Sequence, residues 1–331
     1  MNPTIASGSN TGTKKFHELD VRVLRVGDIL EFALYTRIEG EYLVYRRESL
    51  PFTVEQENAL RNNNISVLFV SSDQLRGFLD YLHDNILHMV SSVQDPEEDA
   101  PLFYHSASEL TRKALRLPMA RENVSTASTV VQSNLHFLGA DRTAIHALMK
   151  QMDAEPTQYQ KALNCCQYGL ALAQAMGVRD PRELEAFGLG LLYMDLGMRQ
   201  IPTHLLGKEG PLSFDEWTVI KRHPAAALQL LDGMPNVPDL TRAVVLGHQE
   251  RLDGSGYPQG LRGDELSLAL RIASVVDTFN ALTTHSPERM RSSFEAISEM
   301  KGTLAGQFDP HILDAFIHIL AEQEQKARAP R

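Results

Sequence analysis

Between residues 16 and 72 the apolar residues come in short runs separated by polar residues, a pattern typical of β-strands. Four such runs, rich in Val, Ile, Leu, Tyr and Phe, lie at residues 21–24, 29–35, 42–45 and 66–70. Glu39 and Gly40 separate the second run from the third, and a glycine between two β-rich runs predicts a hairpin. A short polar helix is expected at residues 54–63, with Thr53 as its N-cap. Residues 16–72 are therefore predicted to form a small α/β module.

After residue 72 the apolar residues recur with the period of an α-helix. This period predicts a long connecting helix over residues 73–93, followed by an acidic, proline-containing linker at residues 94–101. It continues in further segments at residues 104–116, 122–137, 141–151, 158–176, 181–195, 214–232, 238–248, 266–284, 292–303 and 309–327. We therefore expect a mainly α fold, in which an all-α helical bundle follows the small α/β module.

The expected domain organisation follows these changes of pattern. Residues 1–15 are rich in Ser, Thr, Asn and Gly, lack the apolar run of a signal peptide, and are predicted to be disordered. Residues 16–72 form the α/β module, residues 73–101 the connecting helix and linker, and residues 102–331 the helical domain. No run is long and apolar enough to span a bilayer, so we expect a cytoplasmic protein. The helix at residues 73–93 could pair with a second copy and form a homodimer.

The composition is that of an ordinary globular protein, with 43% hydrophobic and 22% charged residues in a chain of 331. The chain has 32 basic and 42 acidic residues, and its formal net charge of -10 opposes a general attraction to nucleic acid. No nucleic-acid partner is therefore expected. The two cysteines, Cys165 and Cys166, are neighbours on a predicted helix, where their side chains diverge by about 100°. This favours two reduced core residues over a disulfide.

The segment at residues 248–258, HQERLDGSGYP, joins several ionisable side chains to a Gly-Tyr-Pro turn. The four glycines of residues 253–263 indicate a shaped loop, and loops of this kind commonly carry recognition. The segment resembles the signature of the HD-GYP family. This resemblance implies an all-α HD-type helical domain that hydrolyses cyclic di-GMP at a metal cluster.

Other segments carry the same resemblance, in the family's order, over roughly half of the chain. Residues 190–202 resemble the pattern LLHDIGKIGIP, residues 214–224 the pattern EWxxIKxHP, and residues 270–283 the pattern ARIlavaDvfDALt. Residues 305–310 resemble the ending GxxFDP. Several motifs in a fixed order are far more specific than any one of them.

The resemblance also implies a set of metal positions, which in this chain are Lys161, Met194, Asp195, His223, His248, Gln249 and Asp277. The positions that keep a ligand side chain are Asp195, His223, His248 and Asp277. The other three positions lack one. The thioether of Met194 and the neutral amide of Gln249 are poor ligands for the metal ions of phosphodiesterases, and the ammonium group of Lys161 repels a cation. Two basic family positions are also replaced, by Met198 and Ser286. The retained ligands predict one or two Fe or Mn ions, or none.

Two groups of residues are expected to bind the substrate or a partner. Arg251 and Arg289 are candidate phosphate contacts. Gly256, Tyr257 and Pro258 shape the loop, and the Tyr257 ring could stack on a guanine or dock a protein. The resemblance implies that this loop also contacts diguanylate cyclase domains.

Three functions remain open. The favoured hypothesis is a catalytically impaired HD-GYP protein that acts in cyclic di-GMP signalling by binding a ligand or partner, because a two-metal hydrolase needs the missing groups. The alternative is a metal-dependent cyclic di-GMP phosphodiesterase with an altered, mononuclear centre. The third is a scaffold whose α/β module does the binding. In a metal-free site His223 and His248 would instead hydrogen-bond to Asp195 and Asp277 and have a structural role. A measurement of metal content separates the first two hypotheses.

Overall fold

The structure is a computed structural model of the chain, and it describes residues 15–92, 95–117, 119–141, 143–152, 157–208, 210–234, 236–284 and 291–327. The chain divides into two compact units, one ending at Leu110 and the other beginning at Thr111. The predicted disordered segment, residues 1–15, lies outside the described residues except for Lys15. The domain limits predicted from the sequence stay a prediction.

The first unit contains two small antiparallel sheets, with strand orders β1-β6-β3-β4 and β2-β5. Their strands are β1 (Phe16–Asp20), β2 (Ile29–Leu30), β3 (Leu34–Ile38), β4 (Glu41–Arg46), β5 (Leu50–Pro51) and β6 (Val67–Ser71). Glu39 and Gly40 join β3 to β4 with φ angles of 50° and 91°. Positive φ at both central residues is the geometry of a tight hairpin turn. The predicted hairpin is therefore confirmed.

The strand predicted at residues 21–24 is wrong. The chain leaves the sheet after Asp20, whose side chain accepts a hydrogen bond from the backbone N–H of Arg22. This cap begins a short 3-10 helix, η1 (Val21–Val23). A local side-chain hydrogen bond of this kind competes with strand pairing.

The helices of the first unit begin where local chemistry favours them. The helix α1 (Val54–Asn62) is capped by Thr53, as predicted, through a hydrogen bond from the Gln56 N–H. The helix α2 (Leu75–Ser92) lies where the connecting helix was expected. The helix α3 (Pro96–Ala114) begins inside the predicted linker, so that prediction is wrong from Pro96 onward. Proline and acidic residues are both favourable in a first helical turn, and the acidic stretch therefore starts a helix.

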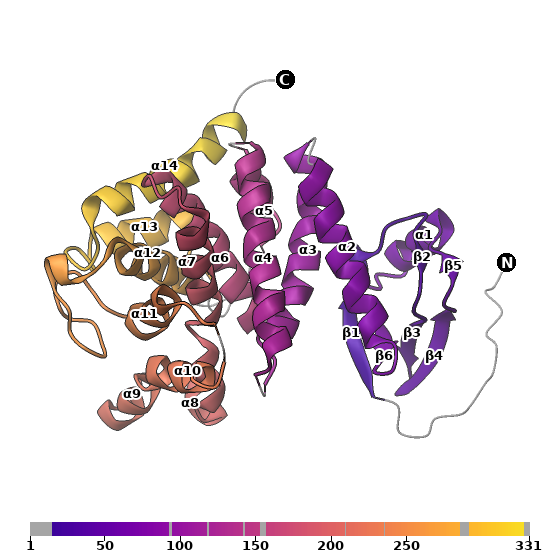
Figure 1. Cartoon of the computed structure of the whole chain (residues 1–331), viewed down its shortest axis with the longest axis horizontal. Helices are drawn as coiled ribbons and strands as arrows, with labels where there is room; N and C mark the ends of the chain where they lie inside the picture. Colours follow the sequence, from indigo (N-terminus) through magenta and orange to yellow (C-terminus); the bar gives the residue numbers. More distant parts are fainter. Residues whose placement is uncertain are drawn as a thin grey trace. The chain divides into compact units, whose positions relative to one another are not determined.

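The described residues of the second unit form helices joined by loops, with one isolated antiparallel bridge between Asp253 and Arg262. Its helices are α4 (Arg121–Ala140), α5 (Ala144–Met149), α6 (Gln158–Ala175), α7 (Pro181–Tyr193), η2 (Leu196–Gln200), α8 (Thr203–Leu206), α9 (Phe214–Ile220), α10 (His223–Leu231), α11 (Asp239–Gly247), η3 (Gly263–Glu265), α12 (Leu268–Thr283), α13 (Ser293–Lys301) and α14 (Pro310–Ala327). Helix α7 packs against α6, α4 and α11, and α12 packs against α6 (Figure 1). The predicted mainly α fold, with an α/β module before a helical bundle, is confirmed.

One predicted helix, residues 214–232, is two helices in the structure. The chain turns at Lys221 and Arg222 between α9 and α10. Pro224 explains the break, because proline has no N–H for the helical hydrogen bond and disfavours helical geometry in the residue before it. The break places His223 at the first position of α10, with its side chain buried.

The core of the second unit lies between α6, α12 and α14. The rings of Tyr168, Phe279 and Phe316 meet edge to face, with centroids 5.0 and 5.6 Å apart, a favourable arrangement for aromatic pairs. Cys165 and Cys166 are buried and unbridged. Within the described ranges, no helix combines the length and the apolar character that crossing a membrane requires.

Candidate metal centre and substrate pocket

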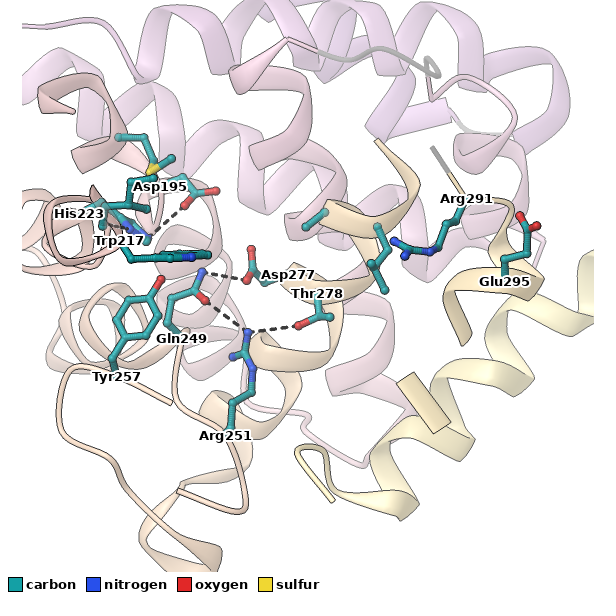
Figure 2. A pocket seen from close by; sticks show the side chains of 14 residues that line it. Asp195, Trp217, His223, Gln249, Arg251, Tyr257, Asp277, Thr278, Arg291 and Glu295 are labelled. Carbon is teal, nitrogen blue, oxygen red and sulfur yellow. Dashed lines mark hydrogen bonds and ion pairs between the residues drawn. The ribbon is translucent and has the colours of Figure 1, made fainter. Parts of the chain in front are cut away.

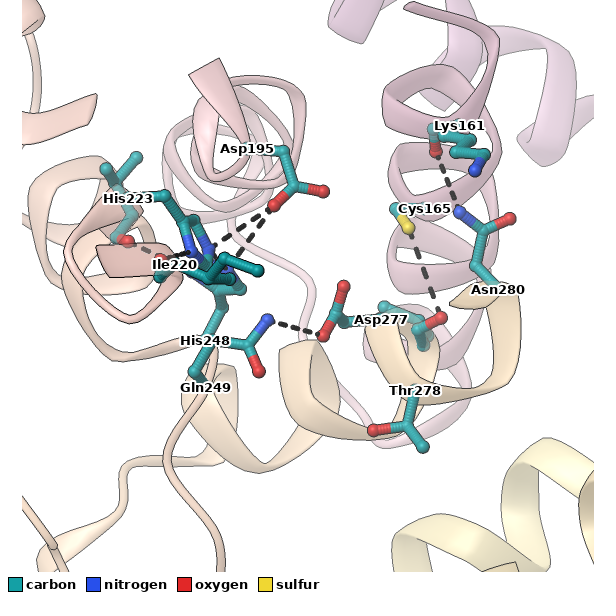
Figure 3. A network of polar contacts seen from close by, with 12 residues as sticks. Lys161, Cys165, Asp195, Ile220, His223, His248, Gln249, Asp277, Thr278 and Asn280 are labelled. Carbon is teal, nitrogen blue, oxygen red and sulfur yellow. Dashed lines mark hydrogen bonds and ion pairs between the residues drawn. The ribbon is translucent and has the colours of Figure 1, made fainter. Parts of the chain in front are cut away.

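Three side chains that can bind a metal converge at the ends of three helical segments. Asp195 follows α7 at the start of η2, His223 opens α10, and His248 follows α11. The Nε2 atoms of the two histidines lie 3.1 Å apart. The Oδ1 atom of Asp195 lies 3.5 Å from Nε2 of His223 and 3.8 Å from Nε2 of His248 (Figure 3). All three ligand atoms lie within 4.8 Å of one another.

Backbone carbonyls orient both imidazole rings. The Nδ1 atom of His223 lies 2.9 Å from the Ile220 oxygen, and that of His248 lies 3.0 Å from the Val245 oxygen. If each Nδ1–H donates to its carbonyl, each neutral ring has a lone pair on Nε2. The two lone pairs then face one another, an arrangement that a cation between them stabilises. Ligand atoms of a metal at about 2.1 Å are roughly 3.0–3.5 Å apart. The separations of 3.1 and 3.5 Å match this range and that of 3.8 Å is slightly longer, so the three residues need only a small adjustment to hold a metal ion.

The electrostatics of the site keep both histidines neutral. Burial lowers the pKa of His223 and of His248, and the neighbouring Asp195 carboxylate opposes this effect. His248 also lowers the pKa of His223 by charge repulsion. A neutral imidazole is the form that binds a metal. Both rings therefore remain able to bind below the pH at which a free histidine takes up a proton.

Asp277, the fourth predicted ligand, lies on α12 beside the other three but does not join their group. Its Oδ2 atom accepts a hydrogen bond of 3.0 Å from Nε2 of Gln249. Burial and the charge of Asp195 raise the pKa of Asp277 to about 7. Asp277 lines the same cavity as Asp195 and His223. Its role as a metal ligand stays a prediction.

The amide of Gln249 is fixed by different groups on its two sides. Its NH₂ donates to Asp277, and its oxygen accepts a hydrogen bond of 3.3 Å from Nη2 of Arg251. Rotating the amide would place its oxygen against the carboxylate and its NH₂ against the guanidinium, and both contacts would be repulsive. Because the oxygen faces Arg251, Gln249 offers no ligand atom on the Asp277 side.

Arg251 is itself held by the chain. Its Nη1 donates to the carbonyls of His248 and Glu250, and its Nη2 donates to Gln249 and to the hydroxyl of Thr278. A guanidinium has five N–H donors, and these four contacts use those on Nη1 and Nη2, so only the Nε–H of Arg251 is available for a further hydrogen bond. Arg251 therefore has a fixed position in the cavity wall and little capacity left for the phosphate that it was predicted to bind.

The Gly-Tyr-Pro loop folds back onto the end of α11. A Cβ atom on Gly256 would lie 2.5 Å from the Cα of Glu250, so only glycine fits there. The buried Glu250 carboxylate accepts hydrogen bonds from the backbone N–H groups of Gln259, at 2.6 Å, and of Leu261, at 3.0 Å. The peptide bond between Tyr257 and Pro258 is cis. Pro258 is exposed.

Tyr257 enters the cavity. Its ring lies 6.2 Å from the His223 ring, and Nζ of Lys221 lies 5.3 Å from its centroid. Burial and the charges of Asp277 and Asp195 raise the pKa of the Tyr257 hydroxyl. The hydroxyl therefore stays protonated and can donate a hydrogen bond to a ligand. Of the two roles open to Tyr257, its position favours ligand contact over docking of a protein.

One cavity of about 830 Å³ connects these groups, a size typical of small-molecule sites (Figure 2). It is lined by Asp195, Met198, Trp217, Ile220, His223, Gln249, Arg251, Tyr257, Asp277, Thr278, Ala281, Leu282, Arg291 and Glu295. Of these, Trp217, Thr278, Arg291 and Glu295 were not predicted from the sequence as site residues. Trp217 lies within the motif that ends at His223 and Pro224, which was the available signal.

The positions that were predicted to have lost function lie in different places. Met194 is buried in the core, whereas Met198 lines the cavity. Lys161 is not among the described residues that line the cavity, and its carbonyl accepts a hydrogen bond from Asn280. Figure 3 shows Lys161 on the far side of Asp277 from the two histidines. Ser286 and Arg289 lie outside the described residues.

Known relatives support the resemblance seen in the sequence. A cyclic di-GMP phosphodiesterase of Pseudomonas aeruginosa is 33% identical over 175 residues, which cover 53% of this chain and 42% of that protein. The cyclic di-GMP phosphodiesterase response regulator RpfG of Xanthomonas campestris pv. campestris is 35% identical over 159 residues, which cover 46% of this chain and 41% of that protein. The 3'3'-cGAMP-specific phosphodiesterase 1 of Vibrio cholerae is 32% identical over 163 residues, which cover 48% of this chain and 36% of that protein. The chain thus spans less than half the length of each of these relatives.

A solved structure and a family model extend this agreement. The structure of a protein described as a HDG"Y"P protein from Bdellovibrio bacteriovorus matches with a TM-score of 0.72 and 19% sequence identity, and the match covers 93% of this chain and 100% of that one. This likeness supports the fold. The model of the family described as HD domain matches residues 144–312, about half of the chain, and this range contains the candidate metal ligands and the Gly-Tyr-Pro loop. The chain therefore belongs to the HD domain family and is an HD-GYP member of it.

Proposed function

We propose that this protein is a metal-dependent phosphodiesterase for cyclic di-GMP or a related cyclic dinucleotide, with one cation held by Asp195, His223 and His248. The observation that carries the proposal is the convergence of the two Nε2 atoms and the Asp195 Oδ1 atom beside a cavity of suitable size, which Asp195 and His223 line. The names of the relatives favour this alternative over the catalytically impaired protein that the sequence analysis preferred. The mixed set of imidazole and carboxylate donors suits Fe²⁺ or Mn²⁺.

The residues around the centre have separate tasks in this proposal. A divalent cation bound there lowers the pKa of water and offsets negative charge on a phosphate. Asp195, His223 and His248 would hold that cation at the ends of α7, α10 and α11. Tyr257, which stays protonated, donates a hydrogen bond to a phosphate oxygen. The indole of Trp217, which is partly exposed in the cavity wall, offers a surface on which a base can stack.

The proposal is tested by measuring metal content and hydrolysis on the purified full chain. We expect about one cation per chain and metal-dependent hydrolysis of cyclic di-GMP when Fe²⁺ or Mn²⁺ is supplied. His223→Ala removes one ligand and should abolish both. His204→Ala changes an exposed histidine on α8, outside the cavity, and should leave both unchanged. A protein that binds no divalent cation under any of these conditions would contradict the proposal.

A second candidate function is binding of the same nucleotide without hydrolysis. It is favoured by the amide of Gln249, whose NH₂ occupies the side of Asp277 where another ligand would be needed. In this case the exposed Pro258 part of the loop serves as the contact for a diguanylate cyclase domain. Tight binding of cyclic di-GMP by the metal-loaded protein with no detectable product distinguishes this function from the first.

A further inference from the structure

The cavity extends well beyond the metal-binding side chains. Arg291 and Glu295 line its other end, just before α13 and in its first turn. Figure 2 shows Asp195 and His223 at one end and these two residues at the other, with the Arg291 guanidinium pointing back toward Thr278. A ligand that reaches both ends must be elongated, as a cyclic dinucleotide is.

Arg291 is held in place by two contacts, but its guanidinium keeps N–H donors that no described residue uses. Its Nε atom makes an ion pair of 2.7 Å with Oε2 of Glu299, and its backbone N–H donates to the carbonyl of Leu282 at 3.1 Å. Within the described residues its two terminal nitrogens have no hydrogen-bond partner. Arg251, by contrast, already donates through both of its terminal nitrogens. Of the two described arginines that line the cavity, Arg291 is therefore the one whose terminal nitrogens are open to a ligand.

The charges around Arg291 disfavour a phosphate there. Glu299 and Glu295 bring two carboxylates to a single guanidinium, and hydrogen bonds from Ser292 lower the pKa of Glu295 and keep it ionised. A phosphate at this end would meet a net negative charge. A nucleobase edge that presents both acceptors and donors fits the pair better.

Guanine has the complementary pattern. Its O6 and N7 atoms accept hydrogen bonds from an arginine, and its N1–H and N2–H groups donate to a carboxylate. One oxygen of Glu295, Oε2, accepts hydrogen bonds of 2.8 Å from the N–H and the hydroxyl of Ser292. Its Oε1 remains available. Adenine presents an amino group where guanine presents O6, so an arginine there meets a donor instead of an acceptor.

We propose that Arg291 and Glu295 form a guanine-selective subsite, which fixes the base identity of the bound cyclic dinucleotide. This inference rests on the proposed function, because it needs a cyclic dinucleotide in the cavity. It assigns base selectivity to the end of the cavity opposite the metal ligands. Relatives named for cyclic di-GMP and for 3'3'-cGAMP show that proteins of this kind differ in base preference.

The test is equilibrium binding of cyclic di-GMP, 3'3'-cGAMP and cyclic di-AMP to the full chain in Mn²⁺ on ice, with the nucleotides checked by chromatography for integrity. The wild-type protein should prefer cyclic di-GMP to cyclic di-AMP by roughly tenfold or more. 3'3'-cGAMP has one guanine and one orientation that places it in the subsite, so it should bind only about twofold more weakly than cyclic di-GMP.

Two variants and a matched control isolate the subsite. Arg291→Met and Glu295→Gln should each bring the preference for guanine close to unity while leaving the affinity for cyclic di-AMP nearly unchanged. Glutamine can keep the capping interaction at the start of α13, so Glu295→Gln should fold normally. Arg242→Met is the control, since Arg242 pairs with Asp232 away from the cavity, and it should not change the preference.

The outcomes separate the two proposals. If the wild-type protein binds cyclic di-GMP and both variants keep its preference, the subsite is overturned and the proposed function stands. If the wild-type protein binds none of the three nucleotides, the proposed function fails and the subsite fails with it. A selective loss of the preference in both variants, with melting temperatures near that of the wild type, supports the subsite.

Discussion

In the proposed metal centre, the side chain of Gln249 affects how many cations can bind. Its amide presents an NH₂ group to Asp277 and directs its oxygen to Arg251, so it supplies a hydrogen bond where a second metal would need a ligand. An imidazole at this position would add a nitrogen donor and release Asp277 from the amide. In the proposed centre Gln249 therefore limits the number of cations, beside Lys161 and Met194, which also lack a ligand side chain.

We predict that Gln249→His raises the metal content of the purified protein from about one cation per chain to about two. The added imidazole and the released Asp277 would together bind the second ion. Elemental analysis after dialysis against Mn²⁺ measures the change. Gln249→Ala, which releases Asp277 without adding a donor, is the control and should keep the wild-type content. An unchanged content in Gln249→His would contradict this account.

Asp277 should make the stability of the metal-free protein depend on pH. Burial and Asp195 raise its pKa to about 7, while Arg251, His223 and the Gln249 hydrogen bond oppose that rise. Between the ordinary aspartate pKa of 3.8 and about 7, the folded protein holds a proton that the unfolded chain has lost. The contribution of Asp277 to the free energy of unfolding therefore falls as the pH rises through this window.

Asp277→Asn should remove this dependence. At pH 8 the variant lacks a buried negative charge beside Asp195, so its melting temperature in EDTA should exceed that of the wild type. At pH 5 Asp277 is already neutral in the folded protein, and the two melting temperatures should be close. Thermal unfolding at both pH values measures the difference. An equal effect of the substitution at pH 5 and pH 8 would show that the charge of Asp277 is not the cause.

Among the helical elements, the contact between η2 and α10 positions the centre. Gly197 lies in η2, and a Cβ atom on it would be 2.0 Å from the carbonyl oxygen of His223 and 2.6 Å from the backbone N of Ala227. The two backbones can approach this closely only because Gly197 has no side chain. This approach brings Asp195, at the start of η2, within reach of His223 on α10.

We predict that Gly197→Ala lowers the free energy of unfolding by roughly 3 kcal/mol or more, because α10 must move away from η2. His223 moves with the helix, so metal affinity should fall as well. Urea unfolding and metal titration measure the two effects. Gly233→Ala is the matched control: its Cβ would meet nothing within 4 Å, and it should change stability by less than about 0.5 kcal/mol.

The sequence predicted elements well where one local signal dominated. The period of apolar residues located α6, α11 and α12 to within a few residues, and Thr53 marked the start of α1. Prediction from the sequence failed where a local effect opposed the period of apolar residues. Pro224 split a continuous helical period, and the first-turn charges of α3 turned a predicted linker into helix. Both corrections follow from the physics of helix starts.

At the scale of the whole molecule, the sequence could predict the candidate ligands but not their grouping. The resemblance to the HD-GYP family indicated Asp195, His223, His248 and Asp277 as one set. The structure groups the first three and pairs the fourth with Gln249. Arg291 and Glu295 were missed because their place in the cavity depends on how α13 folds against α12, a contact that no local pattern encodes.

All three grouped ligands belong to the second compact unit, so a bound cation should stabilise that unit. We predict that Mn²⁺ at about 100 times its dissociation constant raises the free energy of unfolding by about 2.7 kcal/mol. Hydrogen exchange should show the added protection between Thr111 and the C-terminus. His223→Ala should abolish the shift. An equal gain of protection in the first unit would show that the cation binds elsewhere.

The buried Glu250 links the Gly-Tyr-Pro loop to His248, the candidate metal ligand two residues before it. Its carboxylate holds the backbone of Gln259 and Leu261. Any partner that grips the loop and shifts this backbone therefore acts on the end of α11, where His248 lies. Thermodynamic linkage then requires reciprocity: the factor by which such a partner changes cation affinity equals the factor by which the cation changes partner affinity. The concentration of the cation would then set how tightly such a partner binds to the loop.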